Sequence, residues 1–287
     1  MTIIKKVLII GKGSIGIKHK KILKKIKKKI NIFSVKSKKL NEENLKKILT
    51  IKKFDPDYII ISSPATYHFK HMMIIEKIYY SKIVLIEKPL FDKERKLPIK
   101  LKNTYFVGYN LRQDPVLKFI KKYLKNKNYF HVNINCSSYL PSWRKNIKYQ
   151  KSVSSKKSLG GGALLELSHE IDYFYWLFGK VKILSVFNKK ISELDINTDD
   201  YLNFFAKKKK TFFNLSLNFF SKIKKREIII DGKNFSIFGD LRNGKILIFE
   251  KGKKISKIFN SSLDYSIKQQ HLNIFKKRYK SMCSLNE

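Results

Sequence analysis

The chain has 287 residues, and its 63 Lys and Arg against 22 Asp and Glu give a formal net charge of +41. This length suits one large domain or, more commonly, two, and it is enough to bury a sizeable core without disulfides. The two cysteines, Cys136 and Cys283, are far apart and in no metal-ligand spacing. They argue against a disulfide-rich secreted scaffold, so we expect a cytoplasmic location and no metal site. No run of 18 apolar residues and no signal-peptide pattern is present, so no membrane partner is expected.

The high positive charge suggests nucleic-acid binding as one hypothesis. Only six of the 63 basic residues are arginine, although a surface that binds phosphates or bases normally uses the arginine fork as well. The lysines are also spread over nearly every segment of the chain. We therefore interpret the charge as compositional bias and expect no nucleic-acid partner.

The first third of the chain alternates between short apolar runs and amphipathic segments. The apolar runs predict strands at 5–10, 31–36, 56–64, 81–89 and 104–110. The amphipathic segments predict helices at 19–30, 41–54 and 67–80, with Asn41 as a helix N-cap. Continuous apolar strands that alternate with helices indicate a parallel sheet buried on both faces.

After residue 110 the pattern changes. Helices are predicted at 116–124 and 163–179, and a strand at 131–140. Six β-rich runs between residues 181 and 250 are separated by Asn, Asp and Gly turns, which predicts an antiparallel sheet. We therefore expect an α/β protein with two domains, residues 1–110 and residues 111–287.

The segment GKGSIG places Gly11, Gly13 and Gly16 between the first strand and the first helix. In a dinucleotide-binding turn, one glycine forms the tight turn, one lets the main chain approach a pyrophosphate, and one lets the helix pack on the strand. Ser14 and Ile15 begin the helix, whose free N–H groups face the phosphates. The pattern predicts NAD(P) binding, and the alternative is a turn that only packs.

An acidic residue that would hold the ribose 2′-hydroxyl is missing after the second strand. Ser34 and Lys36 stand there instead, which favours the 2′-phosphate of NADP. The alternative, NAD, stays open because lysine is so common in this chain.

The segment VLIEKP places Glu87 and Lys88 at the carboxyl end of the fourth strand, the edge at which open α/β sheets bind ligands. A lysine at this edge can donate a hydrogen bond to a substrate oxygen, or a proton if burial lowers its pKa.

Six segments in order resemble one family of enzymes: GKGSIGIKH, SSPATYHF, EKPL, VGYNLR, LPSWR and LGGGALLELSHEIDYFYWLFG. They are similar to the Gfo/Idh/MocA oxidoreductases, and the resemblance covers roughly residues 5–275. It implies an N-terminal Rossmann domain and a C-terminal α+β domain with an open, mainly antiparallel sheet. Family members transfer a hydride between NAD(P) and a carbon of a sugar, nucleotide-sugar or polyol. The stretch from LPSWR onwards looks closest to members associated with surface-sugar biosynthesis.

The resemblance assigns the catalytic groups. Lys88 matches the family's lysine and His169 its catalytic histidine. Gly160–Gly162 would let the chain pass close to the nicotinamide. The sequence departs from the family where many relatives have Asp four residues before the histidine, because Leu165 stands there. Glu166, three residues before His169, and Asp172, three after it, are the acids expected to take over its role.

Further residues are implied by the same resemblance. The loop after the third strand and the segment after the fifth are expected to line the cofactor, through Ser63, Pro64, His68, Glu87 and Asn110. Two residues of the loop before the glycines, Arg144 and Tyr149, are expected to contact the substrate. For Arg112, a structural pair with a carboxylate is as acceptable as a site role, and His68 can equally be a packing residue.

Two regions look shorter than in the family. Only residues 91–103, broken by Pro98, connect the fourth and fifth strands. After LDYSIKQQHLNIFKKRYKSMCSLNE the family usually adds another helix that returns to the first domain, and we expect that helix to be missing. These shortenings motivate a second hypothesis, a sugar- or cofactor-binding relative without turnover. The resemblance also implies a homo-oligomer formed through the C-terminal sheet.

Overall fold

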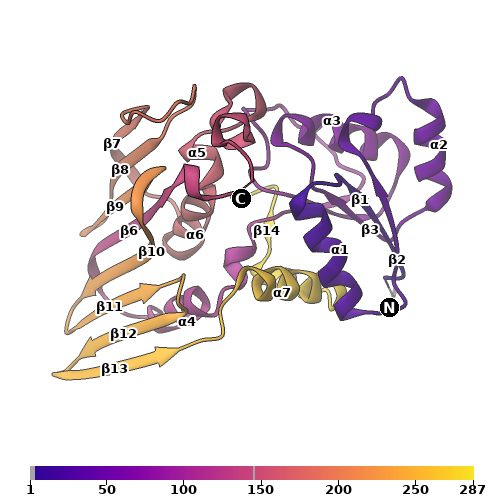
Figure 1. Ribbon diagram of the computed structural model, residues 1–287. Coiled ribbons are helices and arrows are strands. Elements are labelled where there is room, and N and C mark those ends of the chain that lie inside the picture. The colour runs from indigo at the N-terminus through magenta and orange to yellow at the C-terminus, as the bar shows by residue number, and fades with distance from the viewer. Residues whose placement is uncertain (1–3, 145) are drawn as a thin grey trace. The chain divides into compact units, whose positions relative to one another are not determined.

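The computed structural model of the protein describes residues 4–144 and 146–287. The chain forms two compact units, the first made of Met1–Asn110 and Ile267–Glu287, the second of Leu111–Ser266 (Figure 1). Residues 267–287 therefore belong to the first unit, whereas the sequence analysis placed them in the second domain.

The first unit contains a six-stranded sheet in the order β14-β5-β4-β3-β1-β2. Strands β1 to β5 are parallel, and β14 pairs antiparallel with β5 at the edge. This confirms the predicted parallel sheet. Its elements are β1 (Lys6–Ile10), α1 (Ser14–Ile26), β2 (Asn31–Val35), α2 (Leu45–Phe54), β3 (Tyr58–Ile61), α3 (Ala65–Ile78), β4 (Ile83–Ile86), β5 (Thr104–Val107) and β14 (Cys283–Ser284), with most of α7 (Leu263–Phe275).

Both faces of this sheet are covered, as the continuous apolar strands predict. Alternate residues of one strand, such as Leu8 and Ile9, belong to different apolar clusters. One cluster includes Ile51 of α2 and Ile75 of α3, and the other includes Leu23 of α1 together with residues of α7. The sheet is thus the middle layer of three.

The connection between β4 and β5 is as short as expected. Residues 91–103 contain no helix or strand, yet Ile83 and Thr104 are neighbours in parallel register. Helix α7, in the segment LDYSIKQQHLNIFKKRYKSMCSLNE, runs back into the first unit and buries Ile274 in its core. Cys283 of β14 then pairs with Val107 of β5.

The second unit contains an eight-stranded sheet in the order β13-β12-β11-β10-β6-β9-β8-β7. All neighbours are antiparallel except β6 and β9, so the predicted mainly antiparallel sheet is confirmed. Its elements are α4 (Pro115–Tyr123), β6 (Tyr129–Tyr139), α5 (Ala163–Glu166), α6 (Ser168–Phe178), β7 (Lys182–Lys189), β8 (Tyr201–Lys208), β9 (Thr211–Asn218), β10 (Phe220–Gly232), β11 (Phe235–Asp240), β12 (Lys245–Glu250) and β13 (Lys253–Ile258).

Three local details differ from the sequence analysis. The Asn44 side chain caps α2 by accepting from the Lys47 N–H at 3.1 Å, whereas Asn41 only accepts from the Asn44 N–H. The helix predicted at 163–179 is two helices, α5 and α6, because the backbone of Leu167 leaves the helical region. Strand β13 was not predicted, since its sequence KKISKI lacks a continuous apolar run.

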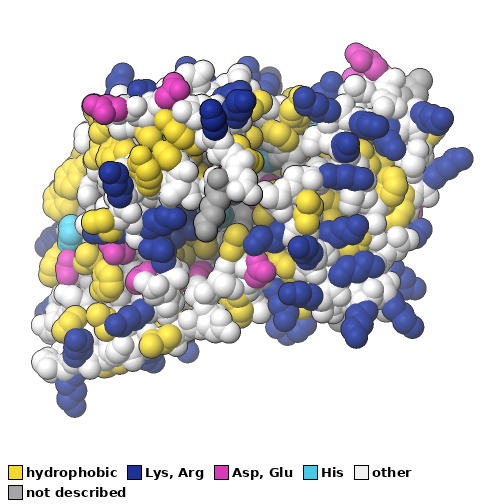
Figure 2. Space-filling model, in the orientation of Figure 1, with side chains coloured by type: hydrophobic (Ala, Val, Ile, Leu, Met, Phe, Trp, Pro, Cys, Tyr) yellow, Lys and Arg dark blue, Asp and Glu magenta, His cyan; other side chains and the backbone are white. Residues whose placement is uncertain are grey.

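Basic side chains are distributed rather than gathered. On the visible face of each unit, Lys and Arg are scattered among other side chains (Figure 2). Within the described residues, no helix is long and apolar enough to cross a membrane.

Candidate functional site

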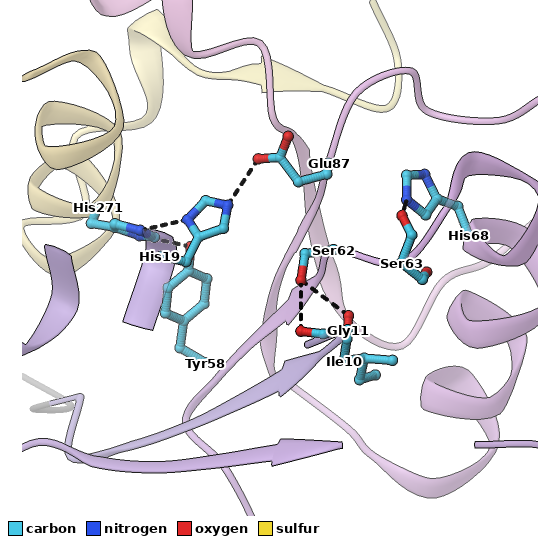
Figure 3. Close-up of polar contacts among 9 residues, drawn as sticks. All are labelled: Ile10, Gly11, His19, Tyr58, Ser62, Ser63, His68, Glu87 and His271. Carbon is cyan, nitrogen blue, oxygen red and sulfur yellow. Dashed lines mark hydrogen bonds and ion pairs between the residues drawn. The ribbon is translucent and has the colours of Figure 1, made fainter. Parts of the chain in front are cut away.

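The glycine turn of the first unit is closely packed at two of its three glycines, Gly11 and Gly16. Figure 3 shows Gly11 beside Ser62. Gly11 has φ +116°, and a Cβ there would lie 2.5 Å from the Ser62 carbonyl oxygen. A Cβ on Gly16 would lie 2.2 Å from the Gly11 carbonyl oxygen and 2.8 Å from Ser62 Oγ. The turn and the first coil of α1 therefore fit against β3 only without side chains.

Gly13 is different, because a Cβ there would meet nothing within 4 Å. It precedes Ser14, which is exposed, and Ile15, which is half-buried, at the start of α1. Among the described residues, no side chain caps this helix end. Free N–H groups at an open helix start suit a phosphate, so the turn fits the pyrophosphate of a dinucleotide.

The end of β2 lies beside this turn, since the Gly11 N–H donates to the Val35 carbonyl at 2.8 Å. Ser34 is half-buried and Lys36 is exposed. Strand β2 and the segment to residue 40 contain no carboxylate. The position that would hold a ribose 2′-hydroxyl is therefore flanked by a hydroxyl and an ammonium group.

The loop after β3 carries Ser63, Pro64 and His68. Ser63 is buried, and Pro64 is the N-cap residue of α3. His68 is completely buried, with Nε2 at 2.8 Å from the Ser63 carbonyl and Nδ1 at 3.0 Å from the Pro89 carbonyl. Burial lowers the pKa of His68, so the ring is neutral near pH 7 and donates one N–H at a time. This placement supports the packing alternative, in which His68 joins the loops after β3 and β4.

Glu87 and Lys88 follow β4 directly. The Glu87 side chain is 5% exposed, and its Oε1 lies 2.9 Å from His19 Nε2 (Figure 3). Lys88 is half-buried and begins the loop that His68 holds at Pro89. The contact of His19 with Glu87, 68 residues away, was not predicted from the sequence.

Asn110, predicted to contact the cofactor, follows β5 and is 2% exposed. Its Oδ1 is buried and has no hydrogen-bond partner among the described residues. Buried polar atoms are almost always paired. A hydrogen-bond donor on a ligand would give this oxygen a partner. The residues of the first unit therefore fit the nicotinamide cofactor that the sequence predicts.

In the glycine run of the second unit, two glycines pack closely against other segments of the same unit. A Cβ on Gly161 would lie 2.4 Å from the Val153 carbonyl oxygen, and one on Gly162 would lie 2.0 Å from Asp199 Oδ1. Gly160 and Gly162 also have positive φ values of 76° and 110°. The requirement for glycine is thus explained within the unit, whereas the sequence analysis attributed it to passage beside the nicotinamide.

Asp199 was missed by the sequence analysis, although it positions the helix that follows the glycines. Its Oδ2 accepts from the Leu164 N–H at 2.8 Å, and its carbonyl accepts from the Ala163 N–H at 3.0 Å. Burial raises the pKa of Asp199, while these N–H groups oppose the rise. No local pattern reveals it, because Asp199 is 35 residues from Leu164.

His169 and Asp172 lie on α6, and both are buried. Asp172 is held by Arg112, whose Nε is 3.0 Å from both carboxylate oxygens and whose Nη2 is 2.7 Å from Oδ1. Arg112 is 1% exposed, so this is a buried bidentate pair. The structural alternative for Arg112 is therefore the observed one, while a catalytic role for Asp172 remains a prediction.

The remaining predicted site residues are less buried. Glu166 is half-buried in the last turn of α5. Arg144 is exposed, and the hydroxyl of half-buried Tyr149 accepts from the Asp195 N–H at 3.1 Å. Arg144 and Tyr149 both line a cavity of about 10 Å³, roughly the room of one water molecule, so this cavity is no sugar site.

No group of three or more His, Cys, Asp or Glu that could hold a metal occurs in residues 4–144 and 146–287.

Solved structures that share this fold include sugar and nucleotide-sugar dehydrogenases. Levoglucosan dehydrogenase in complex with NADH has a TM-score of 0.78 at 14% identity, covering 98% of this chain and 91% of that one. UDP-N-acetylglucosamine 3-dehydrogenase GnnA from Acidithiobacillus ferrooxidans has a TM-score of 0.72 at 14% identity, covering 99% and 92%. The WlbA dehydrogenase from Bordetella pertussis, in complex with NADH and UDP-GlcNAcA, has a TM-score of 0.69 at 14% identity, covering 95% and 87%. No protein-family model matches the sequence, and no curated protein matches it. At these identities the likeness shows the fold: a Rossmann-like unit followed by an α+β unit with an open sheet.

Proposed function

We propose that the protein is an NAD(P)-dependent oxidoreductase of the Gfo/Idh/MocA type that acts on a CH–OH group of a sugar, nucleotide-sugar or polyol. The observation that carries the proposal is the turn at residues 11–16. Gly11 and Gly16 are packed without room for a side chain, while Gly13 opens at an uncapped helix start. The fold shared with three dehydrogenases supports it.

The cofactor, when bound, accepts or supplies the hydride. Gly13, Ser14 and Ile15 would hold its pyrophosphate, and Asn110 would donate to or accept from the nicotinamide end. Lys88 is assigned a hydrogen bond to the reacting substrate oxygen, where it stabilises developing negative charge. His169 is assigned the proton of that oxygen, because imidazole exchanges protons near neutral pH. Glu166 and Asp172 are assigned to steady the imidazolium, with Asp172 itself fixed by Arg112.

The test begins with fluorescence titration of reduced nicotinamide, followed by turnover assays with nucleotide-linked sugars and free polyols. With a substrate that is turned over, Lys88→Met and His169→Ala should each lower kcat by about 10²–10⁴-fold with cofactor affinity little changed. Because both act on one proton transfer, the double variant should lose less than the product of the single losses.

Matched controls are an exposed lysine, Lys93→Met, and an exposed histidine, His131→Ala. Both should keep wild-type kcat. A near-normal kcat for His169→Ala across the pH profile would make His169 structural and remove it from the mechanism. Tight binding of reduced cofactor without turnover on any substrate would favour the second hypothesis, a non-catalytic relative.

We also propose a preference for NADP over NAD. Ser34 and Lys36 at the end of β2 support it, as does the lack of a carboxylate there. Lys36→Glu should weaken binding of reduced NADP and leave that of reduced NAD unchanged or stronger. Equal loss for both cofactors would contradict the preference.

A homo-oligomer through the sheet of the second unit is proposed from its exposed face. Phe187, Phe205 and Phe212 are 47%, 37% and 37% exposed, and a row of amides runs from Asn203 through Asn214 to Asn133 across three strands. A second copy of the same face matches both features. Light scattering should give a dimer or larger, and Phe205→Lys should shift it toward monomer. We also propose a cytoplasmic location, because Cys136 and Cys283 are buried thiols that are not joined in a disulfide.

A further inference from the structure

Four buried side chains of the first unit form a hydrogen-bonded row that ends at Glu87 (Figure 3). Tyr58 Oη is 3.1 Å from His271 Nδ1, and His271 Nε2 is 2.9 Å from His19 Nδ1. His19 Nε2 is in turn 2.9 Å from Glu87 Oε1. The first three residues are completely buried. They come from β3, α7 and α1, so the row links the end of β4 to parts of the chain as far as residue 271.

The direction of the hydrogen bonds follows from the two ends of the row. An ionised Glu87 only accepts, so His19 donates through Nε2. A neutral imidazole carries one N–H, and His19 Nδ1 must therefore accept from His271 Nε2. His271 Nδ1 then accepts from the Tyr58 hydroxyl. Burial lowers the pKa of His271 well below its ordinary value and raises that of Tyr58 well above, so both are neutral near pH 7.

The opposite direction needs either a protonated Glu87 or a doubly protonated His19 as donor, and it makes Tyr58 the last acceptor. The Tyr58 hydroxyl hydrogen would then need a further acceptor. His271 is the hydrogen-bond partner that the described residues offer to this hydroxyl. A buried donor without a partner is costly, so the row favours the direction in which every donor points toward Glu87.

We propose that His19, His271 and Tyr58 are positioning residues for Lys88, because they hold the Glu87 carboxylate, and with it the start of the Lys88 loop, in one orientation. This rests on the proposed function of Lys88. The backbone of Glu87 is already fixed, since its N–H donates to the Ile61 carbonyl at 2.8 Å.

On its other side the Glu87 carboxylate lies against a glycine. A Cβ on Gly108 would be 2.8 Å from Glu87 Oε1, so this carboxylate fills the space that a side chain would need. Gly108 leads directly to Tyr109 and Asn110. Held between the His19 ring and Gly108, Glu87 joins the two strand ends that carry the proposed substrate and cofactor groups.

The direction of the row is tested without any activity, by nitrogen NMR of ¹⁵N-histidine-labelled protein with His19→Gln and His271→Gln used for assignment. Both rings should be neutral Nε2–H tautomers at pH 7. An Nδ1–H tautomer for either ring would overturn the proposed direction, whether or not the protein is an oxidoreductase.

The positioning role is tested by steady-state kinetics on the substrate found for the wild type. His19→Leu should lower kcat by about 10–100-fold with little change in cofactor affinity, since small displacements of reacting groups cost this much. His19→Gln keeps an N–H near the place of Nε2 and should recover most of the loss. His271→Leu and His271→Gln should behave as a weaker pair, and Tyr58→Phe should have the smallest effect.

The matched control is Tyr105→Phe. Tyr105 lies on β5, is 5% exposed and donates to the Glu76 carboxylate at 2.7 Å, outside the row. Loss of the Tyr105 hydroxyl should lower the melting temperature as much as Tyr58→Phe does, while kcat stays at the wild-type value. If the leucine variants lose only thermal stability and keep kcat, the row is an anchor for α7 and the proposal fails. A wild type without turnover would refute the proposed function alone, because the NMR result stands independently.

Discussion

Two glycine-rich turns lead into helices in this protein, and they use glycine for opposite reasons. At residues 11–16 the middle glycine, Gly13, faces open space at an uncapped helix start. In the second run, Val153 and Asp199 occupy the places where side chains of residues 161 and 162 would stand. A glycine run before a helix therefore marks a ligand site only where the space beside it is empty.

The buried polar groups behind the two turns differ as well. Behind the first turn they include four buried histidines: His19, His68, His71 and His271. Near the second they include two ion pairs, Arg112 with Asp172 and Arg226 with Glu170, and Glu170 is completely buried. Burial explains the contrast, because it favours neutral imidazole but requires that a charge be paired.

The largest effect is expected from breaking an ion pair near the second turn. Arg112→Met leaves the buried Asp172 carboxylate without its bidentate partner, which should lower the free energy of unfolding by about 3–5 kcal/mol. Urea denaturation measures it. Arg242→Met is the control, because Arg242 is exposed and should change stability by no more than about 0.5 kcal/mol. Equal losses in both variants would contradict the claim that the Arg112–Asp172 pair is costly to break because it is buried.

The next effect is on binding at the first turn. Gly13→Val places a side chain where the pyrophosphate is proposed to lie, and should weaken cofactor binding by about 100-fold or more, roughly 2.8 kcal/mol. The unfolding midpoint should stay close to wild type, because a Cβ at this position meets nothing within 4 Å. Unchanged affinity for reduced nicotinamide would sink the assignment of this turn.

A smaller effect on stability is expected at the second turn. Gly162→Ala combines a positive φ with a clash against Asp199, and Gly252→Ala has a positive φ of 74° without any neighbour. The first should destabilise the protein by about 2 kcal/mol and the control by about 1 kcal/mol. The difference in unfolding free energy between the two variants, taken from their denaturation curves, measures the cost of the clash with Asp199. If the control loses as much, close packing by Asp199 is not the reason for the glycine.

The smallest expected effect is on the pH dependence of stability in the first unit. Burial lowers the pKa of His71 from 6.5 to about 4, so the unfolded chain binds the extra proton between these values. Stability from this group is complete above about pH 6.5 and is lost as pH falls toward 4, by about 1 kcal/mol per pH unit. Urea denaturation at pH 7 and pH 5 should show a smaller difference in His71→Gln. An identical pH dependence in wild type and variant would contradict the lowered pKa.

Short-range patterns predicted most of the fold. Apolar runs and glycines located the five strands and three helices before residue 110, and alternation located β7 to β12. Strand β13 was not predicted, because its sequence KKISKI has neither a continuous apolar run nor an alternation of apolar and polar residues. The break between α5 and α6 at Leu167 was not predicted, because the apolar pattern of the sequence continues through it.

The candidate site was predictable only where its determinants are local. The glycine turn and the Glu87–Lys88 segment are continuous motifs. A structural pair with a carboxylate was one of two alternatives for Arg112, but the sequence did not identify Asp172 as its partner. The contact of His19 with His271 spans 252 positions, and no pattern in a single sequence connects residues so far apart.

The first unit is discontinuous in sequence, and this has a consequence for biosynthesis. Residues 111–266 form a unit that is contiguous, so it can fold as soon as it leaves the ribosome. The sheet of the first unit still lacks β14, and one of its faces lacks α7, until residues 267–287 are made. The first unit, whose strands β1 to β5 are translated first, is therefore completed last. Its apolar strands must avoid aggregation until residues 267–287 have been synthesised.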